Sequence, residues 1–263
     1  MMRRNKTGKY LLGSGFGLIV LFLILPLLIV IAVSFTSDIF MTFPPKGLSL
    51  QWYRQFLVMS DWREAIKNSI IIASGTAVLS TSIALVMGFV LDRFNIRFGA
   101  LIKTLGMMPF LLPPVIIGIA FMAFFYAVGF SGTLLNVIIA HGIFYSSLPL
   151  MLISVGFESV NKELEEAAMS LGATELKVLS TVTLPLIRND IFAGALFAFI
   201  LSLNEYFIAF LVAGFTVTTL PIKIFSSLRY SYSPTIAAVS VFFIIITTLV
   251  VILIDRLTEG IWD

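Results

Sequence analysis

Hydrophobic residues in this sequence gather into long continuous runs separated by short polar stretches. A helix needs about 20 apolar residues to cross a bilayer. Six runs meet that length, at about 11–35, 68–91, 101–128, 133–157, 186–212 and 234–254. Strands of a membrane barrel would instead alternate over about ten residues. The pattern therefore predicts an all-α integral membrane protein, a single transmembrane domain over 1–263 with six transmembrane helices.

Composition strengthens this interpretation. Of 263 residues, 59% are hydrophobic and only 12% are charged, whereas soluble domains carry about 25% charged residues. This excludes a soluble enzyme and a disordered chain. The first run is about twice the roughly 7–15 residues of a signal-peptide core, so we expect a retained helix. The chain has no cysteine, which excludes disulfides and thiol nucleophiles.

Positive charges indicate the orientation. Six spans place both termini on one side, and with that side cytoplasmic the inner segments hold eleven of the 17 Lys and Arg residues. The inner residues are Arg3, Arg4, Lys6, Lys9, Arg93, Arg97, Lys103, Lys162, Lys177, Arg188 and Arg256. The excess predicts that both termini are cytoplasmic.

Three connecting segments are longer than turns. Two lie outside on this orientation: 36–67, with an amphipathic stretch containing Trp52, Tyr53, Phe56 and Trp62, and 213–233, where Ile222, Phe225 and Leu228 recur at helical spacing. Each predicts a helix at the membrane surface. The third segment, 158–185, lies on the cytoplasmic side.

This cytoplasmic segment reads as two short helices. The first, at about 161–171, has acids near its start, which suit the positive end of a helix dipole. Leu164, Ala167, Ala168 and Leu171 share one of its faces. Gly172 follows as a C-cap, Thr174 caps a second helix, and Pro185 ends it. The small apolar face fits either a docking surface for another protein or packing on the chain's own bundle.

Residues 166–185 resemble the EAA loop of ABC importer permeases, the MetI-like family of binding-protein-dependent transport systems. Glu166-Ala167-Ala168, three residues, Gly172, nine residues and then Val182-Thr183-Leu184-Pro185 follow the spacing of that loop, with Val182 in place of its isoleucine. The resemblance implies that the loop inserts into a cytoplasmic ATPase. It assigns ATPase coupling to Glu166, Ala167, Ala168, Gly172 and Leu184, with Pro185 as the joint to the fifth span.

The chain has no G-x-x-x-x-G-K-[ST] phosphate-binding loop. We therefore expect no cofactor in this chain, with ATP and Mg²⁺ used by a separate ATPase subunit. The chain itself is then a transport subunit and not an enzyme.

One acid lies well inside a predicted span. Glu205 belongs to the polar island Ser202-Leu203-Asn204-Glu205-Tyr206 in the fifth run. Intramembrane acids are functional candidates because insertion costs about 2.5–3.5 kcal/mol. We expect Glu205, Asn204, Tyr206 and Ser202 to line the substrate path. The alternative is a structural acid bonded to His141 or to the backbone.

Two further features lie in the third and fourth runs. Pro109, Pro113 and Pro114 interrupt the third run and predict a helix break, either a hinge or an inert kink. His141, the sole histidine, cannot build a multi-histidine metal site alone. We expect it to make a helix contact and expect no metal.

The segment from Ser202 to Phe225 resembles the PotC-type permeases of spermidine/putrescine importers, with Leu220-Pro221-Ile222-Lys223-Ile224 as a similar segment. This resemblance implies polyamine import into the cytoplasm across a bacterial inner membrane. Two departures leave other small solutes open, such as opines, aminophosphonates or amino-acid-like molecules: Asn204 replaces one acid of a pair, and Pro113-Pro114 stands where an acid is expected.

The implied partners are a cytoplasmic ATPase dimer, a second and homologous permease, a periplasmic solute-binding protein and the lipid bilayer, with no nucleic acid. An ion-coupled secondary transporter is a less favoured alternative, because it should show paired intramembrane charges or internal repeats. An intramembrane metalloprotease would need H-E-x-x-H, which the sequence lacks.

Overall fold

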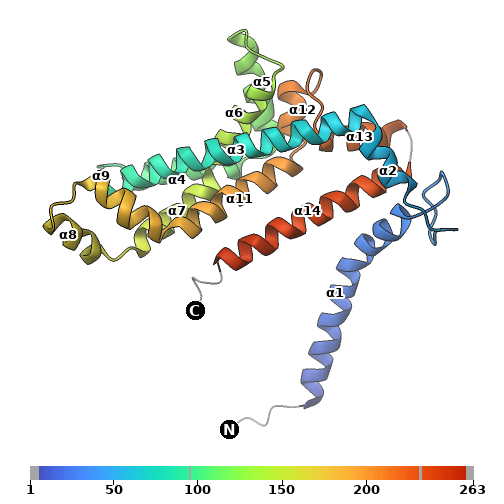
Figure 1. The fold of residues 1–263 in the computed structure, drawn as a ribbon, viewed down its shortest axis with the longest axis horizontal. Coiled ribbons are helices and arrows are strands. Elements are labelled where there is room, and N and C mark those ends of the chain that lie inside the picture. The colour runs from blue at the N-terminus through green and yellow to red at the C-terminus, as the bar shows by residue number, and fades with distance from the viewer. Residues whose placement is uncertain (1–5, 95, 231–232, 259–263) are drawn as a thin grey trace. The chain divides into compact units, whose positions relative to one another are not determined.

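The computed structural model describes residues 6–94, 96–230 and 233–258. Within these ranges the regular elements are helices, with one isolated bridge between Thr36 and Leu48. Three helices are long and apolar enough to span a bilayer: α1 (Lys6–Ser34), α3 (Ser60–Arg93) and α14 (Pro234–Thr258) (Figure 1). They fall on the first, second and sixth predicted runs.

The other candidate spans are bent pairs. The first joins α4 (Gly99–Met107) and the 3-10 helix η1 (Met108–Leu111) to α5 (Pro114–Ala127) at 101°. The second joins α6 (Leu134–Phe144) to α7 (Ser147–Ser159) at 45°. The third joins Glu175–Leu186 to α11 (Arg188–Asn204) at 69°. Counting each pair as one span gives up to six among the described residues, so the helical membrane class is confirmed and the span count lies between three and six.

The fifth predicted run is not one helix. α11 ends at Asn204, and a separate α12 (Phe207–Ala213) follows after Glu205 and Tyr206. The polar island at 202–206 therefore coincides with a helix break.

The chain forms two compact units, one built from residues up to 60 with 224–246 and the other from 61–223 with the chain after 246. In the first unit, α2 (Gln51–Val58) is the helix predicted in the 36–67 segment. Trp52 donates a hydrogen bond from Nε1 to the carbonyl of Thr36 at 2.7 Å, and Phe56 packs on Phe242 with ring centroids 5.8 Å apart. Trp52 and Phe56 are thus buried in protein, unlike the boundary position that their amphipathic spacing predicts.

The second predicted surface helix corresponds to α13 (Leu220–Tyr230). Trp62 lies inside α3, whose N-terminal turns extend into the predicted loop. The turns between Ser60 and Lys67 are therefore helical, and the helix predicted around Trp62 is the start of α3.

In the second unit, α7 packs along α11 and α5 along α12. α11 and α7 approach closely at Gly194, where a Cβ atom would lie 2.9 Å from Pro149 Cα. One apolar cluster forms around Phe125, Val137 and Ile208, and a second around Leu150, Ile153 and Phe157. The second cluster supports the segment that leads to α8 (Lys162–Ser170) and α9 (Glu175–Val178), which lie beyond the C-terminal end of α3 in Figure 1.

Candidate functional site

The segment 158–185 contains a helix–turn–helix. Asn161 caps α8, its Oδ1 accepting a hydrogen bond from the Glu163 amide at 2.9 Å. At the other end Gly172 has φ +90°, and the amides of Gly172 and Ala173 donate to the carbonyls of Met169 and Ala168. This is the glycine C-cap that the sequence predicts. Thr174 then caps α9 through the Lys177 amide, also as predicted.

The outer side of this helix pair is open. The side chains of Leu164, Leu171 and Leu176 are 51%, 90% and 71% exposed. Ala167 and Glu166 are exposed beside them, and Glu166 makes no hydrogen bond or ion pair with any described residue. Exposed apolar side chains grouped in this way are typical of an interaction surface. Of the predicted small apolar face, Leu164, Ala167 and Leu171 are therefore open, whereas Ala168 is half-buried.

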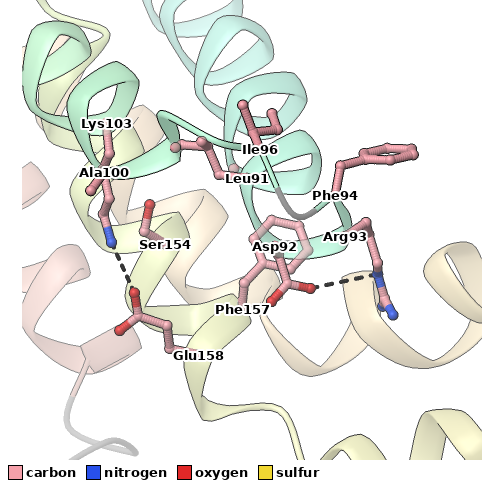
Figure 2. Close-up of a pocket in the computed structure, with 12 residues that line it drawn as sticks. Leu91, Asp92, Arg93, Phe94, Ile96, Ala100, Lys103, Ser154, Phe157 and Glu158 are labelled. Carbon is pink, nitrogen blue, oxygen red and sulfur yellow. Dashed lines mark hydrogen bonds and ion pairs between the residues drawn. The ribbon is translucent and has the colours of Figure 1, made fainter.

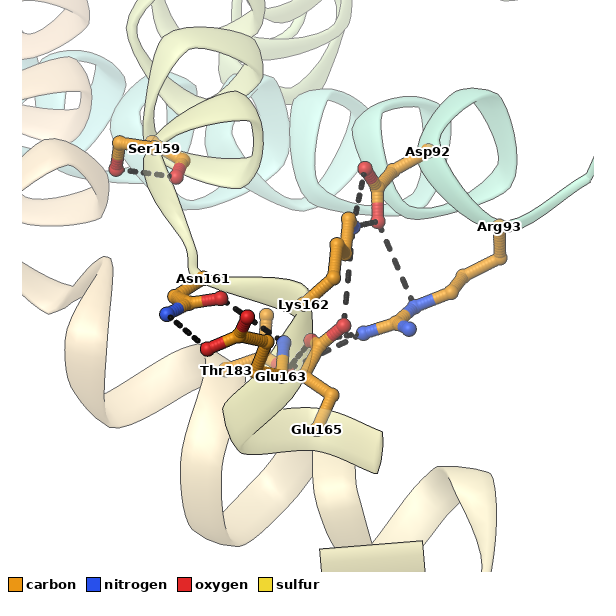
Figure 3. Close-up of polar contacts among 9 residues, drawn as sticks. Asp92, Arg93, Ser159, Asn161, Lys162, Glu163, Glu165 and Thr183 are labelled. Carbon is orange, nitrogen blue, oxygen red and sulfur yellow. Dashed lines mark hydrogen bonds and ion pairs between the residues drawn. The ribbon is translucent and has the colours of Figure 1, made fainter. Parts of the chain in front are cut away.

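The inner side of α8 carries a charge cluster, shown in Figure 3. Glu165 is 1% exposed, and its Oε1 accepts hydrogen bonds from Arg93 Nη2 and, at 2.5 Å, from Thr183 Oγ1. Lys162 Nζ lies 2.9 Å from both carboxylate oxygens of Asp92. Burial raises the pKa of Glu165, but the hydrogen bonds from Arg93 and Thr183 and the charges of Arg93 and Lys162 outweigh it, so the pKa lies below its ordinary value.

Sequence reasoning did not assign a role to this cluster. Arg93 and Glu165 are 72 residues apart, and neither stands in a motif that predicts their contact. The one signal is that Glu165 lies about 100° around the helix from Leu164, off the face that Leu164 and Leu171 share.

Past α9 the chain enters the membrane through an irregular joint. Residues Leu179–Thr183 form a π-helix, η2, followed by α10 (Leu184–Leu186). Leu184 packs on the Leu150–Ile153–Phe157 cluster, and Pro185 lies in the first turn of α10. The 69° bend comes at the residue between the two helices, Ile187, and α11 starts at Arg188. The joint predicted at Pro185 thus lies within two residues of an observed bend.

Beside the Leu150–Ile153–Phe157 cluster is a cavity of about 510 Å³. It is lined by the end of α3, the α3–α4 connection and α7 (Figure 2). Lys103 and Glu158 form an ion pair across it at 2.8 Å, and Asp92 and Arg93 line its other side. These opposed charges pair with one another, and the arrangement presents no single sign of charge to a ligand.

The polar island in the fifth run forms a buried hydrogen-bond network. The two oxygens of the Glu205 carboxylate accept hydrogen bonds from the amides of Ile208 at 2.9 Å and Ala209 at 3.0 Å, which caps α12. His141 Nε2 lies 3.1 Å from Glu205 Oε2, and His141 Nδ1 lies 2.8 Å from Ser202 Oγ. The sequence leaves open that Glu205 is a structural acid bonded to His141 or to the backbone, and the observed contacts are those of this alternative.

The neighbours of Glu205 face different surroundings. Ser202 is buried and donates to Thr76 Oγ1 at 3.2 Å. Asn204 is exposed, with its amide bonded to the Ile200 carbonyl one turn back. Tyr206 is half-buried and stacks on Phe210 at 5.4 Å between ring centroids. The island therefore brings all four predicted path residues to one break, with Asn204 as the exposed polar member.

The three prolines lie at the sharpest bend. Pro109 is in η1, and Pro113 and Pro114 start α5, where the two helices of the pair diverge by 101°. Leu112 between them is extended, and its amide donates to the Pro109 carbonyl. Proline removes the backbone donors that a continuous helix would need here.

A sequence model of the family described as "Binding-protein-dependent transport system inner membrane component" matches residues 80–262. The chain belongs to this family. The match includes α8, η2, the α11–α12 break and α14, so both candidate regions lie inside it.

Two curated relatives belong to polyamine systems. The chain is 35% identical over 227 residues to the putrescine transport system permease protein PotI of Escherichia coli K12, covering 83% of this chain and 80% of PotI. It is 26% identical over 257 residues to the spermidine/putrescine transport system permease protein PotC of Haemophilus influenzae, covering 95% of this chain and 98% of PotC.

The fold also matches a solved permease. A bacterial ABC transporter involved in the import of the acidic polysaccharide alginate aligns with a TM-score of 0.75 at 18% identity, over 100% of this chain and 99% of that one. The family match and these likenesses identify a multi-pass inner-membrane permease subunit of an ABC importer, and not an enzyme. The resemblance drawn from the EAA spacing is thereby confirmed at the level of the family.

Proposed function

We propose that this permease imports a polyamine, putrescine or spermidine, from periplasm to cytoplasm, and that α8 docks in a partner ATPase that drives the cycle. The observation that carries the docking proposal is the open outer face of α8. Leu164, Ala167 and Leu171 are exposed there, next to an unpaired Glu166. An exposed apolar face with one free carboxylate fits a cleft that offers apolar contact and a cation.

The proposed assembly contains two ATPase subunits, a second permease homologous to this one and a periplasmic solute-binding protein. ATP and Mg²⁺ are held by the ATPase, and this chain needs no cofactor. Both termini face the cytoplasm, which follows from the excess of Lys and Arg on that side. The segments 36–59 and 213–233 then face the binding protein. Solved relatives support the kinds of partner, since one is an alginate importer in complex with its pentasaccharide-bound periplasmic protein.

The polyamine proposal is supported by the names of the similar permeases and by the α11–α12 break. Asn204 and Tyr206 flank the break and offer an amide and an aromatic face, which suit a protonated amine. Both Glu205 oxygens already accept backbone hydrogen bonds. We therefore propose a structural role for Glu205, which stabilises the break between α11 and α12. Its negative charge lies behind the path.

Docking is tested by co-purification of the ATPase with tagged permease. Glu166→Lys and Gly172→Asp should each remove the ATPase, and Gly172→Ala should weaken its binding, because φ +90° strains any residue with a Cβ. Gly129→Ala is the matched control. Gly129 also has positive φ, 68°, and an added Cβ at either glycine would meet nothing within 4 Å. Full ATPase recovery with Glu166→Lys and Gly172→Asp would overturn the docking proposal.

The substrate is tested by uptake of radiolabelled putrescine and spermidine into cells that lack other polyamine importers and express the whole importer. Tyr206→Ala should lower uptake several-fold while the ATPase still co-purifies, with Phe207→Ala as a neighbouring aromatic control. Uptake of an amino acid or an aminophosphonate, with none of either polyamine, would reject the polyamine proposal and leave the importer assignment intact.

A further inference from the structure

The inner side of α8 is held differently from that of an ordinary surface helix. Surface helices are ordinarily held by an apolar stripe that faces the core. All nine residues of α8 are described, and the only one buried is Glu165. Leu164 is 51% exposed and Ala167 is exposed, while Ala168 is half-buried. Polar contacts of Glu165 and its neighbours must therefore hold the inner side of α8 in place.

Those contacts reach two other elements. Arg93, the last residue of α3, binds Glu165 through Nη2, and the same nitrogen donates to Thr183 Oγ1 at 3.3 Å. Thr183 belongs to η2, is completely buried and donates to the same Glu165 oxygen. Lys162, the first residue of α8, pairs with Asp92 of α3 at 2.9 Å. We name these five residues, Asp92, Arg93, Lys162, Glu165 and Thr183, the α3–α8 latch (Figure 3).

The backbone contacts of α8 explain why the latch is needed. α8 packs closely against α9 and η2, its neighbours along the chain. A push on α8 would by that route enter α9, η2 and then α11. The ion pairs to Arg93 and Asp92 are what connect α8 with α3, the long helix that leads away from the cytoplasmic end.

One carboxylate oxygen of the latch has no hydrogen-bond donor among the described residues. Glu165 Oε2 is buried and accepts no hydrogen bond from a described residue, and Lys162 Nζ pairs with it only at 3.7 Å. Lys162 is thus shared unequally between Asp92 and Glu165. Lys162 and Glu165 both belong to α8, so a rotation of the helix carries them together. A change of the Lys162 side-chain conformation would bring its ammonium toward Glu165 while Asp92 keeps its ion pair with Arg93 at 3.5 Å, so the latch can shift without leaving a charge unpaired.

We infer that the α3–α8 latch transmits the movement of the docked α8 to α3, with Glu165 and Arg93 as its positioning residues. The inference rests on the proposed docking of α8 in the ATPase. It adds a second route by which the movement of α8 reaches the membrane helices. η2 transmits this movement to α11 and the latch transmits it to α3, so α11 and α3 move together. Loss of the latch should leave the ATPase bound but lower the amount of polyamine imported per ATP hydrolysed.

The test compares Glu165→Gln, Arg93→Gln and the double variant in proteoliposomes that contain the whole importer. The readout is moles of polyamine imported per mole of ATP hydrolysed, with ATPase co-purification measured in parallel. Each single variant should lower the ratio about tenfold, within the usual range of coupling between sites. The double variant should be no worse than either single, because residues of one ion pair act as a unit. Arg93→Lys should recover part of the ratio, since it restores the charge.

Glu163→Gln is the matched control, because Glu163 lies in the same turn but bonds only to Asn161 at its own helix start. If the Glu165 variants fold poorly, Thr183→Val removes one latch hydroxyl at nearly constant shape and should lower the ratio less. An unchanged ratio, or additive single effects, would overturn the latch. Loss of ATPase binding in Glu165→Gln would also overturn it, since Glu165 would then shape the docking surface. Retention of the ATPase by Glu166→Lys would instead refute the docking proposal.

Discussion

Two buried carboxylates, Glu165 in α8 and Glu205 at the α11–α12 break, have similar exposure but different kinds of partner. Glu165 is held by an arginine of α3 and a hydroxyl of η2, with a lysine of its own helix 3.7 Å away. Glu205 is held mainly by the amides of the helix that follows it and by one histidine. The first carboxylate joins helices that are far apart in sequence, and the second shapes the local backbone. A buried acid in a transport protein is therefore assigned a role from its partners, and burial alone does not distinguish the two.

The largest expected effect is at Glu205. Glu205→Ala leaves the Ile208 and Ala209 amides and His141 without an acceptor in a buried site, which should cost about 3 kcal/mol of stability. Glu205→Gln keeps one acceptor oxygen and should cost less. Denaturation of the purified protein in detergent measures both, with the exposed Glu158→Gln as control. A loss below about 1 kcal/mol for Glu205→Ala would show that the carboxylate does not hold the break.

An intermediate effect on the α3–α8 latch is expected when the pH is lowered. The folded pKa of Glu165 lies below its ordinary value, so its contribution is complete at neutral pH and is lost as pH falls below about 4. Protection of α8 amides from hydrogen exchange, corrected for the intrinsic rate, should fall at that pH and stay constant toward alkaline pH. Asp92 and Lys162 face the same cluster, and Asp92→Asn is the control that removes its other carboxylate. Equal pH dependence in wild type and Glu165→Gln would exclude Glu165 as the group responsible.

The smallest effect is expected at Ser202, which belongs to the Glu205 network but caps no helix. Ser202→Ala removes the contacts with His141 and Thr76 and should cost about 1 kcal/mol. Ser82→Ala is the control, because Ser82 is exposed and bonds only to the Val78 carbonyl of its own helix. If both substitutions cost the same, the network would not extend beyond Glu205 and His141.

The sequence could predict what depends on local patterns. Gly172 and Thr174 were identifiable because a glycine after the last periodic residue and a threonine before the next helix have defined capping geometry. The spacing from Glu166 to Pro185 indicated the family, and apolar runs indicated membrane helices. Each of these signals lies within a window of about 30 residues at most.

Contacts between segments far apart in the sequence cannot be predicted from such local patterns. Nothing in the sequence pairs Arg93 with Glu165, since the contact depends on where α3 ends relative to α8. The break at Glu205 was missed for a different reason. The surrounding run is apolar enough for one continuous span, and hydropathy does not show that a glutamate accepts hydrogen bonds from the amides three and four residues later.

The Schellman turn at Gly172 has a consequence for engineering. It ends α8 within a single residue, so the outward face from Leu164 to Leu171 is a short cassette bounded by Asn161 and Gly172. Lys162 and Glu165 are the α8 side chains that pair with α3, and Ala168 is half-buried. The exposed positions of α8 other than Lys162 can therefore be exchanged without repacking the membrane helices. On the proposed docking of α8, exchanging fewer than ten surface positions would fit this permease to a different ATPase.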